Sequence, residues 1–154
     1  MYKEIERKFL VKGNIGEYLP LTCIRISQGY IFQTDGGVLR VRIADDTAFL
    51  TIKSNNTDGE CLEYEYPIPV KDAQHMMEHM CTHILYKKRY IKHHLNHKWE
   101  IDIFPNLLIL AEVELSDINE PIHIPCWVGE EVTGQEAYFN NNILQQMVDF
   151  SHPD

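Results

Sequence analysis

Apolar and polar residues alternate along much of this chain, as they do in β-strands, whose successive side chains point to opposite faces of a sheet. In the first such stretch Ile5 separates Glu4 from Glu6, and in a later one Val41 separates two arginines. Turn-forming residues lie between the stretches, and Thr-Asp-Gly-Gly at 34–37 is typical of a hairpin. The alternation predicts strands at residues 3–11, 22–33, 38–43, 47–54, 61–68, 84–94, 97–104 and 107–115.

Helical spacing of apolar residues is confined to a few segments. The clearest helix is expected at residues 71–82, where Met76, Met77 and Met80 would supply its apolar side. Other helices are expected at 14–19, near 130–132 before Gly134, and at 141–149. Mostly sequential strands with few helices are typical of an antiparallel β-barrel. A length of 154 residues suits one domain, spanning 1–154.

Composition excludes several classes of protein. A hydrophobic content of 44% and a charged content of 24% are those of a folded protein. No apolar run approaches the ~20 residues needed to span a bilayer, and the first residues do not resemble a signal peptide. We therefore expect a cytoplasmic protein with no membrane partner. A net charge of −9 argues against nucleic acid as the main partner, but not against a small anion.

The cysteines are far apart and form no C-x-x-C motif, so the sequence predicts free thiols and neither a zinc site nor a redox pair. They are Cys23, Cys61, Cys81 and Cys126.

Charged residues two positions apart recur on nearly every predicted strand, and each set would lie on one face of its strand. The sets are Glu4/Glu6/Lys8, Arg40/Arg42, Lys53, Glu63/Glu65, Lys87/Arg89, Glu100/Asp102 and Glu112/Glu114. For any one pair, a solvent-facing surface of a half-buried strand is the commoner explanation. Most of the pairs have like charges, however, and like charges side by side are unfavourable on an ordinary solvent face.

A barrel with these groups inside would concentrate carboxylates and bases in one cavity. Clustered carboxylates raise each other's pKa, and clustered cations repel each other, unless ligands of opposite charge are bound. A divalent cation together with a chain of phosphates would neutralise both sets. Carboxylate ligands suit Mg²⁺ or Mn²⁺, and arginine binds phosphate oxygens in bidentate fashion. The pattern therefore indicates a metal-using site for a polyanion.

The ordered set of motifs resembles the CYTH family, also called triphosphate tunnel metalloenzymes. The first strand matches the family signature E-x-E-x-K at Glu4, Glu6 and Lys8. Motifs in the family's order then follow along nearly the whole chain, at 28–30, 40–42, 50–53, 63–65, 87–90, 99–104, 111–115 and 132–134.

This resemblance implies an eight-stranded, closed antiparallel β-barrel, or tunnel, with a polar charged lumen, a few flanking helices and a triphosphate bound to its inner wall. Residues implied to hold the metal are Glu4, Glu6, Asp102, Glu112 and Glu114, with Glu63 and Glu65 as further candidates. Those implied to bind the triphosphate are Lys8, Arg40, Arg42, Lys53, Lys87 and Arg89, with Tyr30 as a further candidate. The implied catalytic residues are Glu4, Glu6 and Lys8.

The family's activities include hydrolysis of inorganic triphosphate, hydrolysis of thiamine triphosphate and cyclisation of ATP. Because no aromatic cluster is evident beside the charged residues, we expect inorganic tripolyphosphate to be the preferred small-molecule substrate. An adenylate cyclase, a thiamine triphosphatase and a non-catalytic polyphosphate- or nucleotide-binding module are the alternatives. The sequence leaves open whether the protein is a monomer or a homodimer.

Overall fold

Nine strands, two α-helices and two short 3-10 helices make up the part of the chain that the computed structural model describes, residues 3–55 and 57–151. The strands are β1 (Lys3–Val11), β2 (Ile24–Thr34), β3 (Gly37–Ala44), β4 (Thr47–Ser54), β5 (Glu60–Ile68), β6 (Ile84–His94), β7 (His97–Ile103), β8 (Ile109–Glu114) and β9 (Val128–Glu131). The helices are η1 (Ile15–Tyr18), α1 (Val70–Met80), η2 (Glu136–Tyr138) and α2 (Asn140–Ser151). Within these residues no helix is long and apolar enough to cross a membrane.

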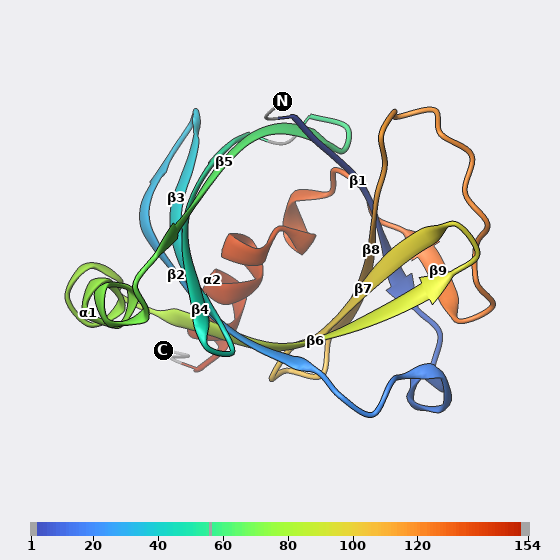
Figure 1. Ribbon diagram of the computed structural model, residues 1–154, viewed down its shortest axis with the longest axis horizontal. Coiled ribbons are helices and arrows are strands. Elements are labelled where there is room, and N and C mark those ends of the chain that lie inside the picture. The colour runs from blue at the N-terminus through green and yellow to red at the C-terminus, as the bar shows by residue number, and fades with distance from the viewer. Residues whose placement is uncertain (1–2, 56, 152–154) are drawn as a thin grey trace.

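The first eight strands form a closed antiparallel ring, which confirms the predicted fold class (Figure 1). Hydrogen bonds join them in the order β5-β4-β3-β2-β6-β7-β8-β1, and pairing of β1 with β5 closes the ring. At the closure, the Glu6 amide donates to the Gly59 carbonyl over 2.9 Å. Gly59 has a φ of +87°, and a Cβ there would lie 2.6 Å from the Glu6 carbonyl oxygen. Only glycine fits this approach of the two strands without strain.

Strand β9 corrects one prediction. A helix was expected near residues 130–132, but this segment pairs with the end of β1, through Phe9 with Glu131 and Val11 with Val128. The beginning of β1 uses the same edge to pair with β5, which leaves the rest of that edge free. Tertiary pairing with this edge decides the structure of a segment whose local preference is weak.

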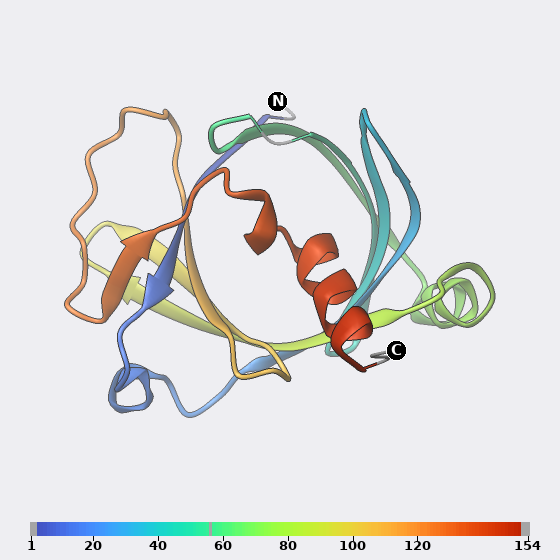
Figure 2. The same cartoon turned by 180° about the vertical axis from the view of Figure 1, so that it is seen from behind.

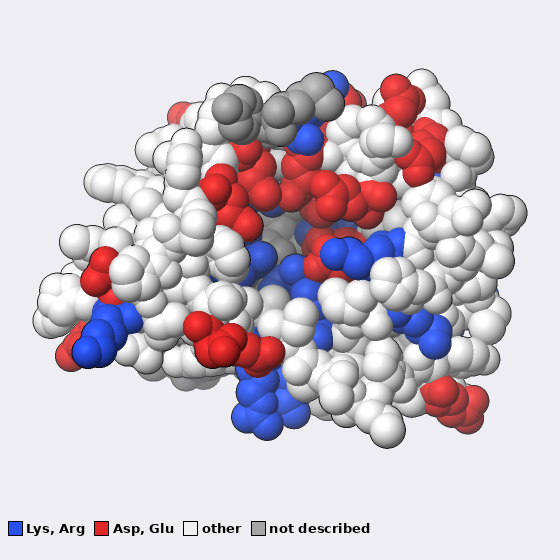
Figure 3. Space-filling model, viewed as in Figure 1, with Lys and Arg blue, Asp and Glu red and all other residues white. Residues whose placement is uncertain are grey.

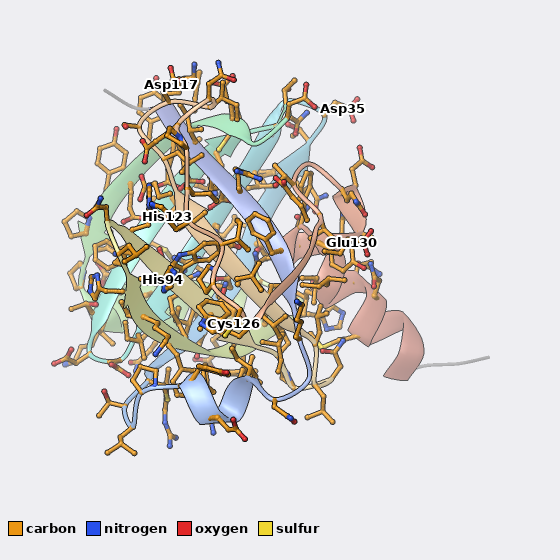
Figure 4. All side chains as sticks on the ribbon, turned by 90° about the vertical axis from the view of Figure 1, so that its right-hand side faces the viewer. Asp35, His94, Asp117, His123, Cys126 and Glu130 are labelled. Carbon is orange, nitrogen blue, oxygen red and sulfur yellow. The ribbon has the colours of Figure 1, made fainter. Side chains whose placement is uncertain are left out.

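Apolar residues on the outside of the ring are covered by other segments over part of its surface, although Phe32, Ile52 and Leu62 stay exposed, and the charged face is left inside. Helix α1 packs through Ala73 on a cluster that includes Val41 and Ala48 of β3 and β4. The segment of residues 115–127 covers β1, β7 and β8, where Trp99 and Trp127 pack edge to face. Figure 4 views this side of the molecule and labels His123 and Cys126 on that segment.

Helix α2 and the preceding η2 lie across one opening of the ring (Figure 2). Ile143 of α2 packs with Leu85, Phe104, Leu110 and Val132 in a third buried cluster. This packing holds the first residues of α2 next to the interior of the ring.

Candidate active site

The interior of the ring contains a cavity of about 240 Å³ whose lining residues are all charged except Asn140. Acidic and basic side chains gather around this central hollow in Figure 3. The lining residues are Glu4, Glu6, Arg40, Arg42, Lys53, Glu63, Glu65, Lys87, Arg89, Glu100, Glu112, Glu114 and Asn140. Lys8 and Tyr30 line an adjoining compartment of about 120 Å³, which shares Glu6, Arg40, Lys53 and Asn140 with the larger one.

Asp102 is not among the residues that line this cavity, and it is only 1% exposed. Its carboxylate accepts two hydrogen bonds from Arg89, from Nε over 2.8 Å and from Nη2 over 2.9 Å. Lys87 Nζ lies 2.8 Å from the same carboxylate. Burial alone would raise the pKa of Asp102, but the two cations outweigh burial and hold it below its usual range. Both oxygens of Asp102 are thus bonded to basic side chains. Within the described residues, none of the other predicted metal ligands has both of its oxygens engaged in this way.

The two bases beside Asp102 differ in how firmly they hold their protons. Burial lowers the pKa of Lys87 to about 7, although Asp102 opposes this effect. Arg89 also lies 2.5 Å from Glu100, so it is held by two carboxylates. Both residues line the cavity.

Arg42 is oriented by a fully buried glutamine that the sequence reasoning did not single out as a site residue. Arg42 Nε donates to Gln28 Oε1 over 3.1 Å, and Gln28 Nε2 donates to the Tyr30 hydroxyl over 2.8 Å. Burial, with Arg40 and Arg89 nearby, lowers the pKa of Arg42 to about 10. Gln28 and Tyr30 are two residues apart on β2, a spacing that could have indicated a shared inward face.

Arg40 has no such support. Its side chain is buried, and no hydrogen bond or ion pair joins it to another residue in 3–55 or 57–151. A buried guanidinium without an acceptor is costly, so this group favours binding of an anion.

Glu6 is the carboxylate with the least compensation. No ion pair or hydrogen bond joins its side chain to the rest of the described chain, and burial, together with Glu112, raises its pKa well above the usual value. Glu4 instead lies 2.8 Å from Lys53, and Glu112 lies 3.4 Å from Lys8.

Two further carboxyls have raised pKa values. Burial and a hydrogen bond with Glu4 raise the pKa of Glu63 to about 7, and burial raises that of Glu114. Buried carboxyls that lie close together in this way repel one another when ionised, and a bound cation relieves that repulsion.

The chemistry of these acids fits a hard divalent cation, but they are not gathered into a ready-made cage. Among residues 3–55 and 57–151 no three His, Cys, Asp or Glu side chains are placed to hold a metal ion. Two of the acids are paired with bases instead, Glu4 with Lys53 and Glu112 with Lys8. Cation binding would require these carboxylates to change partners.

The smaller compartment contains features that the sequence did not indicate. Tyr30 and Phe139 line it, so two aromatic residues do lie beside the charged set. The Tyr30 hydroxyl is engaged by Gln28, and the Phe139 ring lies 5.8 Å from Lys8 Nζ. Both rings therefore support the polar groups of the site. The cysteines are free thiols, as predicted, and only Cys61 lines this compartment.

The chain belongs to the CYTH domain family, whose family model matches residues 2–146. It is 39% identical over 149 residues to a protein of Acetivibrio thermocellus named inorganic triphosphatase, covering 94% of this chain and 95% of that one. It is 35% identical over 147 residues to an inorganic triphosphatase of Nitrosomonas europaea, covering 89% and 93%.

Solved structures agree with this assignment. The crystal structure of the inorganic triphosphatase NE1496 has a TM-score of 0.62 at 30% identity, covering 91% of this chain and 96% of that one. A putative adenylate cyclase from Bacillus halodurans also has a TM-score of 0.62, covering 98% and 91%. Its identity of 15% shows a shared fold only.

Proposed function

We propose that this protein is a metal-dependent hydrolase of triphosphates whose preferred substrate is inorganic tripolyphosphate. The observation that carries the proposal is the interior cavity, in which every lining residue except Asn140 is charged. Such a lining suits phosphate oxygens and cations, and it provides little apolar contact for an organic group. The two curated relatives named inorganic triphosphatase support the same substrate.

The basic residues would bind the phosphate chain. Arg40 is buried without an acceptor, and Arg42 is held by Gln28, so both can direct N–H groups at phosphate oxygens. Lys87 and Arg89 are fixed from behind by Asp102. Lys8 and Lys53 would exchange their present carboxylate partners for phosphate.

Carboxylates of the first and eighth strands would hold the cation. Glu4, Glu6, Glu112 and Glu114 are proposed as ligands for Mg²⁺ or Mn²⁺, with Glu63 and Glu65 as further candidates. When bound, the cation would neutralise phosphate charge and lower the pKa of an attacking water. Asp102, which the sequence placed in this group, is proposed instead to position Lys87 and Arg89.

The chain's own groups would then orient the reaction. Glu4 and Glu6 can accept hydrogen bonds from the attacking water and take its proton. Lys8 and the arginines would stabilise the negative charge that develops on the transferred phosphoryl group.

One kinetic comparison tests the proposal. Phosphate release from tripolyphosphate, ATP and thiamine triphosphate should be measured at one pH with Mg²⁺, with Mn²⁺ and with excess chelator. We expect the highest kcat/KM for tripolyphosphate, no turnover with chelator, and at most traces of cyclic AMP from ATP. Cyclic AMP as the main product would contradict the proposal, as would full activity in chelator.

A further inference from the structure

The first turn of α2 lies at the junction of the two compartments. Asn140 lines both of them, and Asn141 lines the smaller one. Two hydrogen bonds anchor this turn to the ring, since Lys8 Nζ donates to the Tyr138 carbonyl over 2.9 Å and Lys87 Nζ donates to Asn140 Oδ1 over 2.8 Å. The start of the helix is thus fixed beside the charged cavity.

The first two backbone N–H groups of α2, those of Asn140 and Asn141, have no acceptor among the described residues. The amides of Asn142 and Ile143 both donate to the Phe139 carbonyl over 2.9 Å, so Phe139 is the N-terminal cap residue. Free amides at the start of a twelve-residue helix carry a partial positive charge that favours anions.

Arg40 is independent evidence that an anion binds beside the start of α2. It lines the same two compartments, is only 5% exposed, and its Nε has no hydrogen-bond partner. Arg40 therefore borders one space with Asn140 and Asn141, the two residues whose amides lack an acceptor in the described chain. Glu6 also lines it, and the cation that we place on the carboxylates would offset its charge.

We infer that Arg40 and the first-turn amides of α2 together form a binding site for one phosphate group. The ligand chemistry is a phosphate dianion, either the terminal group of a bound tripolyphosphate or the orthophosphate released from it. The identity of these two ligands rests on the proposed function, whereas the anion site itself rests on the geometry. The helix start would then take part in binding as well as in closing one opening of the ring.

Substitutions at Asn140 can separate its backbone amide from its side chain. Asn140→Ala removes the hydrogen bond to Lys87 but keeps the N–H, whereas Asn140→Pro removes both. Proline is tolerated at the first position of a helix, and Phe139 already has the extended backbone that proline requires before it, with φ −73° and ψ 137°. The two variants therefore differ chiefly in one N–H group.

Orthophosphate binding to the full chain, measured by calorimetry with Mg²⁺ present to offset the charge of Glu6, is the first test. A hydrogen bond from an amide to a charged group predicts that Asn140→Pro binds at least about tenfold more weakly than Asn140→Ala. Circular dichroism checks that both variants keep the wild-type fold. Equal affinity of the two folded variants would overturn the inference.

A second variant tests the same site through charge. Asn141→Asp places a carboxylate at the helix start, which should raise Tm while it weakens orthophosphate binding. Gln74→Glu, on the exposed side of α1, makes the same change in net charge away from the cavity and should leave binding unchanged. Unaltered binding in Asn141→Asp, or equal weakening in both variants, would overturn the site.

Tripolyphosphate hydrolysis measured on the same proteins distinguishes this inference from the proposed function. One outcome is that the wild type hydrolyses tripolyphosphate, while Asn140→Ala and Asn140→Pro have equal kcat/KM and equal affinity for orthophosphate. This outcome would support the proposed function and contradict the anion site. If orthophosphate binding depends on the amide but no triphosphate is hydrolysed, the anion site stands and the proposed function fails.

Discussion

Replacing Asp102 with asparagine should destabilise the protein more than any other single removal of a carboxylate from the site. The carboxylate is 1% exposed and is shared by Lys87 at 2.8 Å and Arg89 at 2.8 Å. Breaking a buried ion pair by removing one partner costs about 3–5 kcal/mol, because the remaining charge is left uncompensated. For a chain of this size that corresponds to a fall in Tm of roughly 6–20 °C.

The loss of stability in Asp102→Asn should depend on pH, because Lys87 titrates. Its pKa is about 7 in the fold, against about 10.4 for lysine in an unfolded chain. Between these values the unfolded state binds more protons, so wild-type stability rises with pH. Without Asp102 the pKa of Lys87 should fall further. The stability of Asp102→Asn should therefore begin to rise with pH at a lower pH than that of the wild type. The difference in free energy of unfolding between wild type and Asp102→Asn should therefore narrow as pH rises to about 7 and stay constant above it.

Urea unfolding followed by circular dichroism at several pH values from 5 to 9 measures this difference. Glu65→Gln is a matched control, because Glu65 faces the same cavity but bonds only the neutral Thr51 hydroxyl, over 3.3 Å. The control should change the free energy of unfolding by less than about 0.5 kcal/mol. A loss below about 1 kcal/mol for Asp102→Asn at pH 6 would refute the role of Asp102 as the anchor of the two bases.

Three further outcomes are expected. Glu6→Gln should lower kcat/KM for tripolyphosphate by at least about 100-fold. An unchanged kcat/KM would remove Glu6 from the site. The same substitution should keep or raise Tm. Because burial and Glu112 raise the pKa of Glu6, the gain in stability over the wild type should grow as pH rises above about 4.3. Gln28→Leu should raise KM about tenfold with little change in kcat, since Arg42 and Tyr30 lose their shared partner; an unchanged KM contradicts this. Tripolyphosphate at a hundredfold excess over its Kd should stabilise the protein by about 2.7 kcal/mol, and no thermal shift with any triphosphate would count against the cavity as its site.

Much of the fold could be predicted because strand periodicity is a local property. Ile5, Val41 and Val113 alternate with charged residues, and each is buried in a cluster on the outside of the ring. A period of two puts charged residues that are two positions apart on one face, whichever way the strand is later paired. The ordered motifs then identified the family, and with it the expectation that the charged face points inward.

The helix expected near residues 130–132 shows where local patterns fail. Four residues carry little intrinsic preference, and their structure depends on the free edge of β1, more than a hundred residues earlier. The first turn of α2 was missed as part of the site for the same reason. Its position beside Lys8 and Lys87 comes from packing of Ile143 and is not visible in the spacing of its own residues.

The sequence by itself determined which side chains are charged, how they are spaced and that they share strand faces. Only the tertiary structure decided which charges pair. Asp102 and Glu112 look alike along the chain, yet one is held by Lys87 and Arg89 and the other faces Lys8. Arg40 and Arg42 are likewise equivalent in the pattern, but only Arg42 meets Gln28. The physical reason is that ion pairs and hydrogen bonds are set by distances of a few ångströms across the ring, which depend on closure of the whole sheet.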